Sequence, residues 1–211
     1  MKMTNRWNTF IYRLWAPIYD ATVDHFFMPG RRQALQALAL QPGEHVLIVG
    51  VGTGADLPLL CSGVRAAGID LSPDMLSHAR AKLPLLGREV ILLQADAQLP
   101  LFAQGSFDTA ILSLILSVVP DGAACLREAL RALKPGGRMV VFDKFLPDQS
   151  RLGFARRLLN FFSSLFGTDI TRRFSDLAAG SPCQVLRNDA SLMRGTYRVI
   201  LLQKTQTNPI D

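Results

Sequence analysis

The feature that most constrains this chain of 211 residues is a glycine-rich turn that follows a short apolar run. Val46–Val49 supplies the run, and three glycines then stand at alternate positions, Gly50, Gly52 and Gly54. Glycine accepts backbone angles and close contacts that a Cβ would exclude, so such a turn lets the main chain approach a ligand. The turn therefore predicts a nucleotide-type cofactor site after the first strand of a sheet.

The residues around these glycines leave the kind of nucleotide open. Thr53 and Asp56 suit the start of a following helix, whose free N–H groups favour polar or anionic groups. The spacing Gly50-x-Gly52-x-x-Ala55 also fits the looser dinucleotide fingerprint G-x-G-x-x-G/A. A plain structural turn is a further alternative, so the glycines alone do not decide.

Acidic residues near the ends of the next two apolar segments narrow the choice. Asp70 ends a second strand 20 residues after Gly50, where a carboxylate can bind both ribose hydroxyls of either cofactor. Asp96 lies near the end of a third strand, predicted over Val90–Ala97. Two further segments complete the pattern, a fourth strand over Ser106–Ser113 and the turn Leu133–Gly137 before a fifth strand.

In this order and spacing, the segments closely resemble the class I S-adenosylmethionine-dependent methyltransferases, over about residues 10–204. Within that family the chain is similar to the small ubiquinone/menaquinone-type and phosphatidylethanolamine N-methyltransferases. The resemblance implies an α/β fold with a Rossmann-like, doubly wound, mostly parallel sheet of about seven strands. Gln184–Arg187 and Tyr197–Lys204 would be the last two strands, the final one antiparallel.

The resemblance also implies the cofactor, S-adenosylmethionine, with S-adenosylhomocysteine as its product. Asp70 would bind the ribose, and Asp96 would face the adenine amino group. The residues expected to contact the cofactor are Gly50, Val51, Gly52, Thr53, Gly54, Asp56, Asp70, Leu71, Met75, Asp96, Ala97, Ser113, Tyr12 and Tyr19.

One position departs from the family pattern. Members usually carry an acidic residue two places before the first glycine, where this chain has Ile48. That carboxylate normally helps to hold the amino end of the cofactor's methionine moiety. Its absence predicts weaker cofactor binding, a contact shifted to Asp56 or to the N-terminal segment, or a member that has lost catalysis.

Length and patterning predict a single domain, because 211 residues can bury one substantial core and are few for two. We expect an aromatic and basic cap over residues 1–32 and a cofactor-binding core over residues 44–145. An insertion over residues 146–180 and a terminal strand pair over residues 181–204 would follow.

Helices are expected between the strands, an alternation that implies a parallel sheet wound on both sides. Their expected positions are Arg31–Leu40, Pro73 to about Leu83 after a Ser72 cap, and a segment after an Asp121 cap.

The sequence favours a cytoplasmic protein. Its longest apolar run, Ala110–Val119, is too short to span a bilayer and predicts a buried central strand. The first residues do not match a secretory signal pattern. Three scattered cysteines are expected to be reduced, and three separated histidines predict that no metal site is present.

Positive charge is concentrated in two segments. The chain carries a net charge of +6, of which residues 1–32 contribute +3 and residues 151–173 contribute +4. The rest of the chain is close to neutral, so the two segments that flank the predicted catalytic framework are the basic ones.

The second basic segment is also strongly amphipathic. At about 100° per residue, one half of its helical wheel is apolar and rich in phenylalanine, and the other half carries arginines. This pattern predicts contact with an anionic membrane surface or with a lipophilic substrate, although a helix packed on the sheet edge is an equal alternative. The residues expected to bind substrate are Phe161, Phe162, Arg156, Arg157 and Arg172.

The N-terminal segment Trp7–Asp20 is similarly aromatic and resembles the Tyr-Asp segment by which small methyltransferases cover the cofactor. Tyr12 and Tyr19 could contact cofactor or acceptor there, or could simply fix an N-terminal helix to the body. The sequence contains no convincing general base. Asp143, His25 and Tyr19 are weak candidates, with a buried structural role favoured for Asp143 and a surface position for His25.

These features predict methyl transfer to a small lipophilic acceptor. Phosphatidylethanolamine or a related amine lipid matches both the phenylalanines and the arginines. A quinone precursor, methylated on carbon or oxygen, explains the apolar face equally well, and an unrelated hydrophobic metabolite is a third option. Nucleic acid is not expected as a partner, so RNA methylation or plain RNA binding is a minor alternative, and an inactive cofactor-binding protein is the alternative of another class. Oligomeric state is left open.

Overall fold

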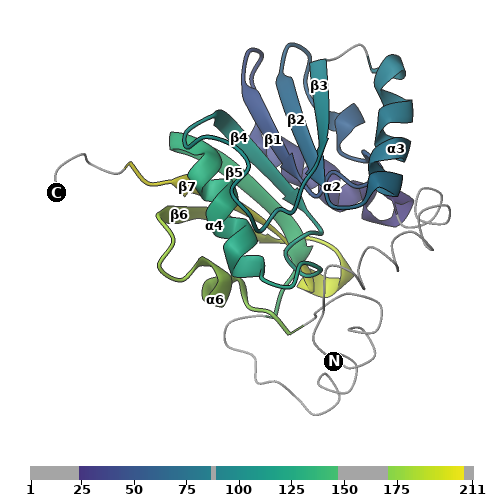
Figure 1. The fold of residues 1–211 in the computed structure, drawn as a ribbon. Coiled ribbons are helices and arrows are strands. Elements are labelled where there is room, and N and C mark those ends of the chain that lie inside the picture. Colours follow the sequence, from purple (N-terminus) through teal and green to yellow (C-terminus); the bar gives the residue numbers. More distant parts are fainter. Residues whose placement is uncertain (1–23, 87–88, 147–170, 207–211) are drawn as a thin grey trace.

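The computed structural model describes residues 24–86, 89–146 and 171–206 (Figure 1). The helices and strands in chain order are α2 (Asp24–Leu38), β1 (His45–Val49), β2 (Arg65–Asp70), α3 (Pro73–Lys82), β3 (Glu89–Gln94), β4 (Phe107–Ser113), α4 (Gly122–Ala132), β5 (Leu133–Lys144), α6 (Phe174–Ala178), β6 (Cys183–Ala190) and β7 (Tyr197–Lys204). The same described residues also contain the short 3-10 helices η2 (Leu57–Leu59), η3 (Leu83–Leu85) and η4 (Met193–Gly195).

The strands form one seven-stranded sheet in the order β3-β2-β1-β4-β5-β7-β6. The five strands β1 to β5 run parallel, whereas β7 is antiparallel to both of its neighbours, β5 and β6. This arrangement confirms the predicted fold class. After β1 the chain builds outward through β2 and β3, then returns to the other side of β1 with β4, so the carboxyl end of β1 lies where the strand order reverses. In open α/β sheets this is where ligands bind.

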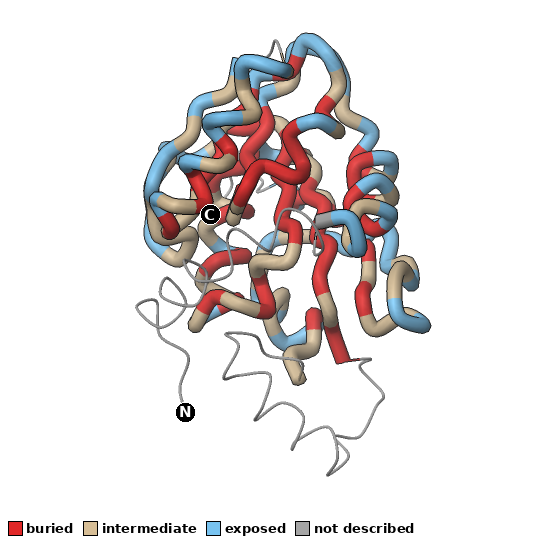
Figure 2. The backbone as a smooth tube through the Cα atoms, turned by 90° about the vertical axis from the view of Figure 1, so that its right-hand side faces the viewer, coloured by how far each residue is buried: buried red, intermediate tan, exposed pale blue. Residues whose placement is uncertain are grey.

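Alternate residues of β1 enter two different hydrophobic cores, one on each face of the sheet. Val46 and Ile48 pack with residues of α2 and α3, and Leu47 and Val49 pack with residues of α4. Figure 1 shows α2 and α4 on opposite faces of the sheet. Figure 2 shows that the buried residues are concentrated in the middle of the molecule. All four of these side chains are at most 2% exposed. Burial on both faces is the reason that β1 is a continuous apolar run rather than an alternating one.

Two predicted helix caps are confirmed by hydrogen bonds. The Ser72 hydroxyl accepts from the Met75 backbone N–H at 3.3 Å, with Pro73 at the first helical position of α3. Asp121 accepts from the Ala124 backbone N–H at 2.9 Å at the start of α4. Each cap satisfies a helix donor that would otherwise lack a partner.

The helix predicted at Arg31–Leu40 is longer at its start and shorter at its end, since α2 spans Asp24–Leu38. Pro29 lies inside it, although proline removes a helical hydrogen bond and ordinarily ends or kinks a helix. Tertiary packing outweighs that local preference here. The Phe27 ring lies 5.0 Å from the Tyr197 ring and 6.2 Å from the Phe142 ring, measured between centroids.

The helix expected directly after the glycine turn is replaced by the short 3-10 helix η2. Its hydrogen bonds join residues three apart, from the Leu57 N–H to the Gly54 carbonyl and from the Leu59 N–H to the Asp56 carbonyl. Pro58 has no N–H with which to continue an α-helical ladder. The strand predicted over Val90–Ala97 also ends earlier, at Gln94, so Asp96 lies in the turn beyond it.

Gly30 provides a test of how α2 packs on the sheet. A Cβ at this position would lie 2.2 Å from Cζ of Phe142, a fully buried ring on β5. Alanine is about 1 kcal/mol better than glycine in a helix interior, but forcing extra volume into a packed core costs about 1–3 kcal/mol. We expect Gly30→Ala to lower the free energy of unfolding in urea titrations. The added change Phe142→Leu should make Gly30→Ala less destabilising, and equal costs in both backgrounds would contradict this packing.

Candidate active site

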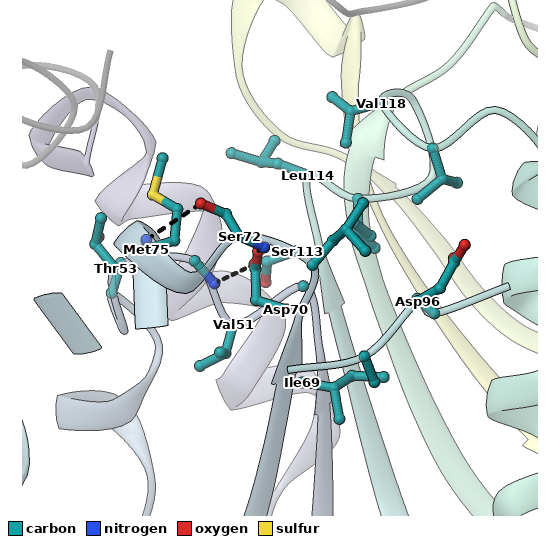
Figure 3. A pocket seen from close by; sticks show the side chains of 18 of the residues that line it. Val51, Thr53, Ile69, Asp70, Ser72, Met75, Asp96, Ser113, Leu114 and Val118 are labelled. Atoms are coloured by element: carbon teal, nitrogen blue, oxygen red, sulfur yellow. Dashed lines mark hydrogen bonds between the residues drawn. The ribbon is translucent and has the colours of Figure 1, made fainter. Parts of the chain in front are cut away.

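A pocket opens at the carboxyl ends of β1, β2 and β4 (Figure 3). Its space amounts to about 880 Å³ including the open mouth. Most of its walls are apolar, and a few polar groups converge on it. The lining residues are Arg31, Gly50, Val51, Gly52, Thr53, Ala55, Ile69, Asp70, Leu71, Ser72, Met75, Ala95, Asp96, Ala97, Ser113, Leu114, Ile115, Val118 and Val119.

The glycine turn forms one side of this pocket and is bonded to the neighbouring strand. The backbone N–H groups of Gly50 and Val51 both donate to the Ile69 carbonyl, each at 2.9 Å. Gly52 has a φ of +55°, and a Cβ on it would meet no atom within 4 Å. The turn therefore leaves open space against its own backbone, as a bound nucleoside requires.

Asp70 lies at the centre of the site. Its Oδ2 accepts from the Gly52 N–H at 2.8 Å, drawn as a dashed line in Figure 3, and its Oδ1 accepts from the Ser72 N–H at 2.9 Å. Burial raises the pKa of Asp70, although the backbone N–H groups of Ser72, Gly52 and Leu71 act in the opposite direction. Further donors, such as the two hydroxyls of a ribose, would stabilise the ionised carboxylate that burial disfavours.

A second carboxylate and a buried hydroxyl complete the polar groups of this region. Asp96 accepts from the backbone N–H of Gln98 at 3.0 Å and from its side-chain amide at 2.8 Å. In the view of Figure 3, Thr53 and Asp96 lie on opposite sides of Asp70. Ser113, at the end of β4, is 5% exposed, and its Oγ has no hydrogen-bond partner among residues 24–86, 89–146 and 171–206. A buried hydroxyl at a pocket wall can be satisfied by a ligand.

The opposite wall is the segment 114–119, which was predicted to continue the central strand. The strand ends at Ser113 because Leu114 adopts a left-handed conformation with φ of +59°. The Leu114 N–H donates to the Phe142 carbonyl at 2.7 Å, which holds this turn against β5. The segment after Ser113 therefore leaves the strand, and Leu114, Ile115, Val118 and Val119 line the pocket.

Two charged side chains fix that wall from outside the pocket. Asp143 is fully buried and accepts from the backbone N–H groups of Ser117 at 2.9 Å and Lys144 at 2.8 Å. The guanidinium of Arg172 donates to the carbonyls of Leu116, Val119 and Pro120, the last two at 2.8 and 3.0 Å. Neither Asp143 nor Arg172 lines the pocket. This geometry favours a positioning role for both side chains.

Of the expected cofactor residues, ten line the pocket, namely Gly50, Val51, Gly52, Thr53, Asp70, Leu71, Met75, Asp96, Ala97 and Ser113. Gly54 and Asp56 lie behind it, with Asp56 only 1% exposed. His25 is exposed and is not a lining residue. Other expected site residues lie outside the described residues, and they are Tyr12, Tyr19, Arg156, Arg157, Phe161 and Phe162.

Sequence reasoning missed the apolar wall and one charged residue. Ile115, Val118 and Val119 belonged to a run read as a strand, and nothing in that run signalled the turn at Leu114. Arg31 was assigned only to a helix start, yet its side chain lines the pocket. No local pattern distinguishes it from a surface arginine.

The described part of the chain contains no group of three or more His, Cys, Asp or Glu side chains that could hold a metal ion. Within the same residues, no helix has both the length and the apolar character needed to cross a bilayer. The three cysteines are free thiols, and burial raises the pKa of Cys125 to about 12. Among the described residues, the charged groups of the pocket are therefore two carboxylates and one arginine, set between apolar walls.

Comparison with known proteins gives consistent matches. A family model described as a methyltransferase domain matches residues 47–141. A phosphatidylethanolamine N-methyltransferase of Cereibacter sphaeroides is 36% identical over 159 residues, which are 74% of this chain and 77% of that protein. A demethylmenaquinone methyltransferase of Beutenbergia cavernae is 33% identical, and the match covers 69% of this chain and 58% of the relative. The solved structure of an S-adenosylmethionine-dependent methyltransferase from Methanosarcina mazei has the same fold, with a TM-score of 0.62 at 22% identity over 80% of this chain and 95% of that one.

The role of Asp70 can be tested by binding. Replacing it with alanine would remove the charged acceptor that is predicted to bind two ribose hydroxyls, and each such bond would contribute about 1.5–3 kcal/mol. We expect Asp70→Ala to weaken S-adenosylhomocysteine at least about 30-fold in calorimetric titration. Asp189→Ala, which removes a carboxylate on β6 far along the sheet, is the matched control and should bind normally. Unchanged affinity of the Asp70 variant would contradict the ribose assignment.

Asp143 should make stability depend on pH. Burial raises the pKa of this carboxyl above its ordinary value of 3.8, despite the opposing effects of Lys144 and Ser117. Between 3.8 and the raised value, the folded protein holds a proton that the unfolded chain releases, so this group lowers stability as pH rises through that window. Asp143→Asn removes the titration. Relative to wild type, the variant should gain unfolding free energy as the pH rises from about 3.8 towards the raised pKa of Asp143. A difference that stays constant over this range would contradict the assignment.

Proposed function

The chain belongs to the S-adenosylmethionine-dependent methyltransferases, and from that premise we propose that it methylates the amine of a lipid such as phosphatidylethanolamine. The family membership sets aside the dinucleotide interpretation of the glycine turn. S-Adenosylmethionine is the cofactor, and when bound it supplies a methyl group on a positively charged sulfur. The choice of acceptor rests on the placement of the insertion, on the titratable groups of the pocket and on the name of the Cereibacter relative.

The observation that carries the proposal is where the two ends of the insertion lie. The Leu146 N–H donates to the Arg172 carbonyl at 2.9 Å, so the chain leaves and re-enters the described structure at one point. The rings of Phe145 and Phe174 pack edge to face there, with centroids 5.4 Å apart. The side chain of Arg172 bonds the 114–119 wall. The residues on either side of 147–170 therefore lie together, next to the wall of the pocket that Arg172 contacts.

The sequence of the insertion suits a lipid. Residues 151–166 carry phenylalanines on one half of a helical wheel and arginines on the other, with Phe161, Phe162, Arg156 and Arg157 as the residues proposed to meet the acceptor. Apolar residues would contact acyl chains, and arginines would meet a phosphate or an anionic membrane surface. We therefore propose that the protein works in the cytoplasm at the surface of an anionic membrane.

The pocket suits an amine better than a phenol or a ring carbon. A neutral amine can attack a methyl group without a strong base, whereas those other acceptors benefit from one. Among the described lining residues, the titratable side chains are Arg31, Asp70 and Asp96, and both carboxylates accept hydrogen bonds from N–H groups. The residues that remain act by positioning the reactants and by excluding water, which can lower a barrier by several kcal/mol.

A quinone precursor is the second candidate. The demethylmenaquinone methyltransferase of Beutenbergia cavernae is a relative, and the apolar wall Leu114–Val119 would suit a prenylated ring. An inactive cofactor-binding protein is the alternative of another class, and it rests on Ile48.

The deciding experiment uses purified protein, methyl-labelled S-adenosylmethionine and a cell extract divided into lipid and aqueous fractions. We expect label in the lipid fraction, on an amine lipid resolved by chromatography. Label on a quinone would replace the first candidate by the second. Label in the aqueous fraction only would reject a lipid acceptor, and no label despite bound S-adenosylhomocysteine would favour the inactive protein.

The insertion can be tested separately with the variant Phe161→Ser/Phe162→Ser. We expect transfer to lipid to fall by about tenfold, because two apolar contacts contribute about 1.5–3 kcal/mol each when fully buried and less at a membrane surface. Affinity for S-adenosylhomocysteine should not change. Ser163→Ala/Ser164→Ala, on the polar half of the wheel, is the matched control. Loss of folding in the phenylalanine variant would instead assign these residues to the core.

A further inference from the structure

A buried ion pair lies beside the glycine turn. Nη1 of Arg31, on α2, lies 2.8 Å from Oδ2 of Asp56, which follows the glycines. The two side chains are 8% and 1% exposed. Arg31 lines the pocket, whereas Asp56 lies behind it.

A buried ion pair is an energetically unfavourable way to hold a helix against a turn. Burying two charges costs several kcal/mol per ion, and apolar residues of similar volume are often equally stable or more stable in their place. Asp56 is incompletely satisfied as well, because its Oδ1 is buried without a hydrogen-bond partner among the described residues. A charged group on the wall of a mostly apolar pocket is the kind of group that fixes the orientation of a ligand.

The charges of the pocket show what that role can be. Arg31 is the only cationic side chain among the described lining residues, and it faces a site whose carboxylates are Asp70 and Asp96. The cofactor carries a carboxylate at its amino-acid end, and its ribose and adenine are assigned to the two aspartates. A guanidinium offers paired N–H donors that match a carboxylate in geometry and charge.

The position at which the family usually places an acid cannot serve this end of the cofactor. Ile48 is fully buried and packs in the core formed with α2. Asp56 brings a buried carboxylate to the other side of the same turn, where it contacts Arg31.

We propose that Arg31 binds the carboxylate of the cofactor's methionine moiety and that Asp56 is the positioning residue that holds the guanidinium in place. The amino-acid end of the cofactor is then recognised from α2, through an ion pair, and not from the end of β1. The recognition concerns the cofactor alone and does not depend on the acceptor.

The test compares two ligands that differ in one group, S-adenosylmethionine and its decarboxylated form, which keeps the amine and the sulfonium. Binding is measured by calorimetry without acceptor. The wild-type protein should prefer the complete cofactor by roughly 10- to 100-fold, the range of a charged hydrogen-bonded contact. Arg31→Gln should lose this preference by weakening the complete cofactor alone. Affinity for the decarboxylated form should change by less than about threefold, since it makes no such contact.

Three further variants separate ligand binding from an effect on folding. Arg31→Gln leaves Asp56 buried without its cation, which can destabilise the protein. The double variant Arg31→Gln/Asp56→Asn removes both charges and should show the same lost preference with a melting temperature near that of wild type. Arg32→Gln changes the exposed neighbour on α2 and should keep the full preference. Asp56→Asn alone should reduce the preference in part, an effect that a purely structural pair would not produce.

Two outcomes would overturn the proposal. If the folded double variant still prefers the complete cofactor as wild type does, Arg31 does not bind the carboxylate. If it loses affinity equally for both ligands, the pair only supports the glycine turn. Neither outcome bears on the lipid acceptor, which is decided by the label experiment.

Discussion

Two backbone hydrogen bonds hold the ligand-binding end of the sheet together. The N–H groups of Gly50 and Val51 both reach the Ile69 carbonyl, so the glycine turn is tied to β2 at the point where the strand order reverses. Asp70 comes next in β2 and accepts from the Gly52 N–H, while its other oxygen accepts from Ser72 at the cap of α3. The turn, the Asp70 carboxylate and the helix start thus form one unit. The shape of the pocket depends on it.

The wall that faces this unit is held differently. Leu114 has a left-handed backbone, a conformation that costs a non-glycine residue about 1–3 kcal/mol. Three long-range contacts offset that cost, from the Phe142 carbonyl, from Asp143 and from Arg172. The Arg172 carbonyl also accepts from the Leu146 N–H, so the residue that holds the wall also joins the two sides of the segment 147–170. On the proposed function, the fold thereby links the cofactor pocket to the segment that would meet the acceptor.

The residue that departs from the family pattern has a structural explanation. Ile48 contributes to the core between β1 and α2, while charged groups gather a few residues further along the turn, in the pair of Asp56 with Arg31. On the proposal above, an apolar residue at position 48 is compatible with an intact cofactor site. The alternative that the protein binds cofactor without catalysis is then tested by measuring methyl transfer.

Local chemistry determined much of this protein from its sequence. The short apolar strands, the caps at Ser72 and Asp121 and the order of glycine turn, Asp70 and Asp96 are encoded by neighbouring residues and by spacing, so they could be predicted. The tertiary structure alone decided that α2 continues through Pro29, that the central strand stops at Ser113 and that Arg31 enters the pocket. Each of these depends on contacts between residues distant along the chain, such as Phe27 with Tyr197 or Arg31 with Asp56, and such contacts leave no periodic or local signal in a single sequence.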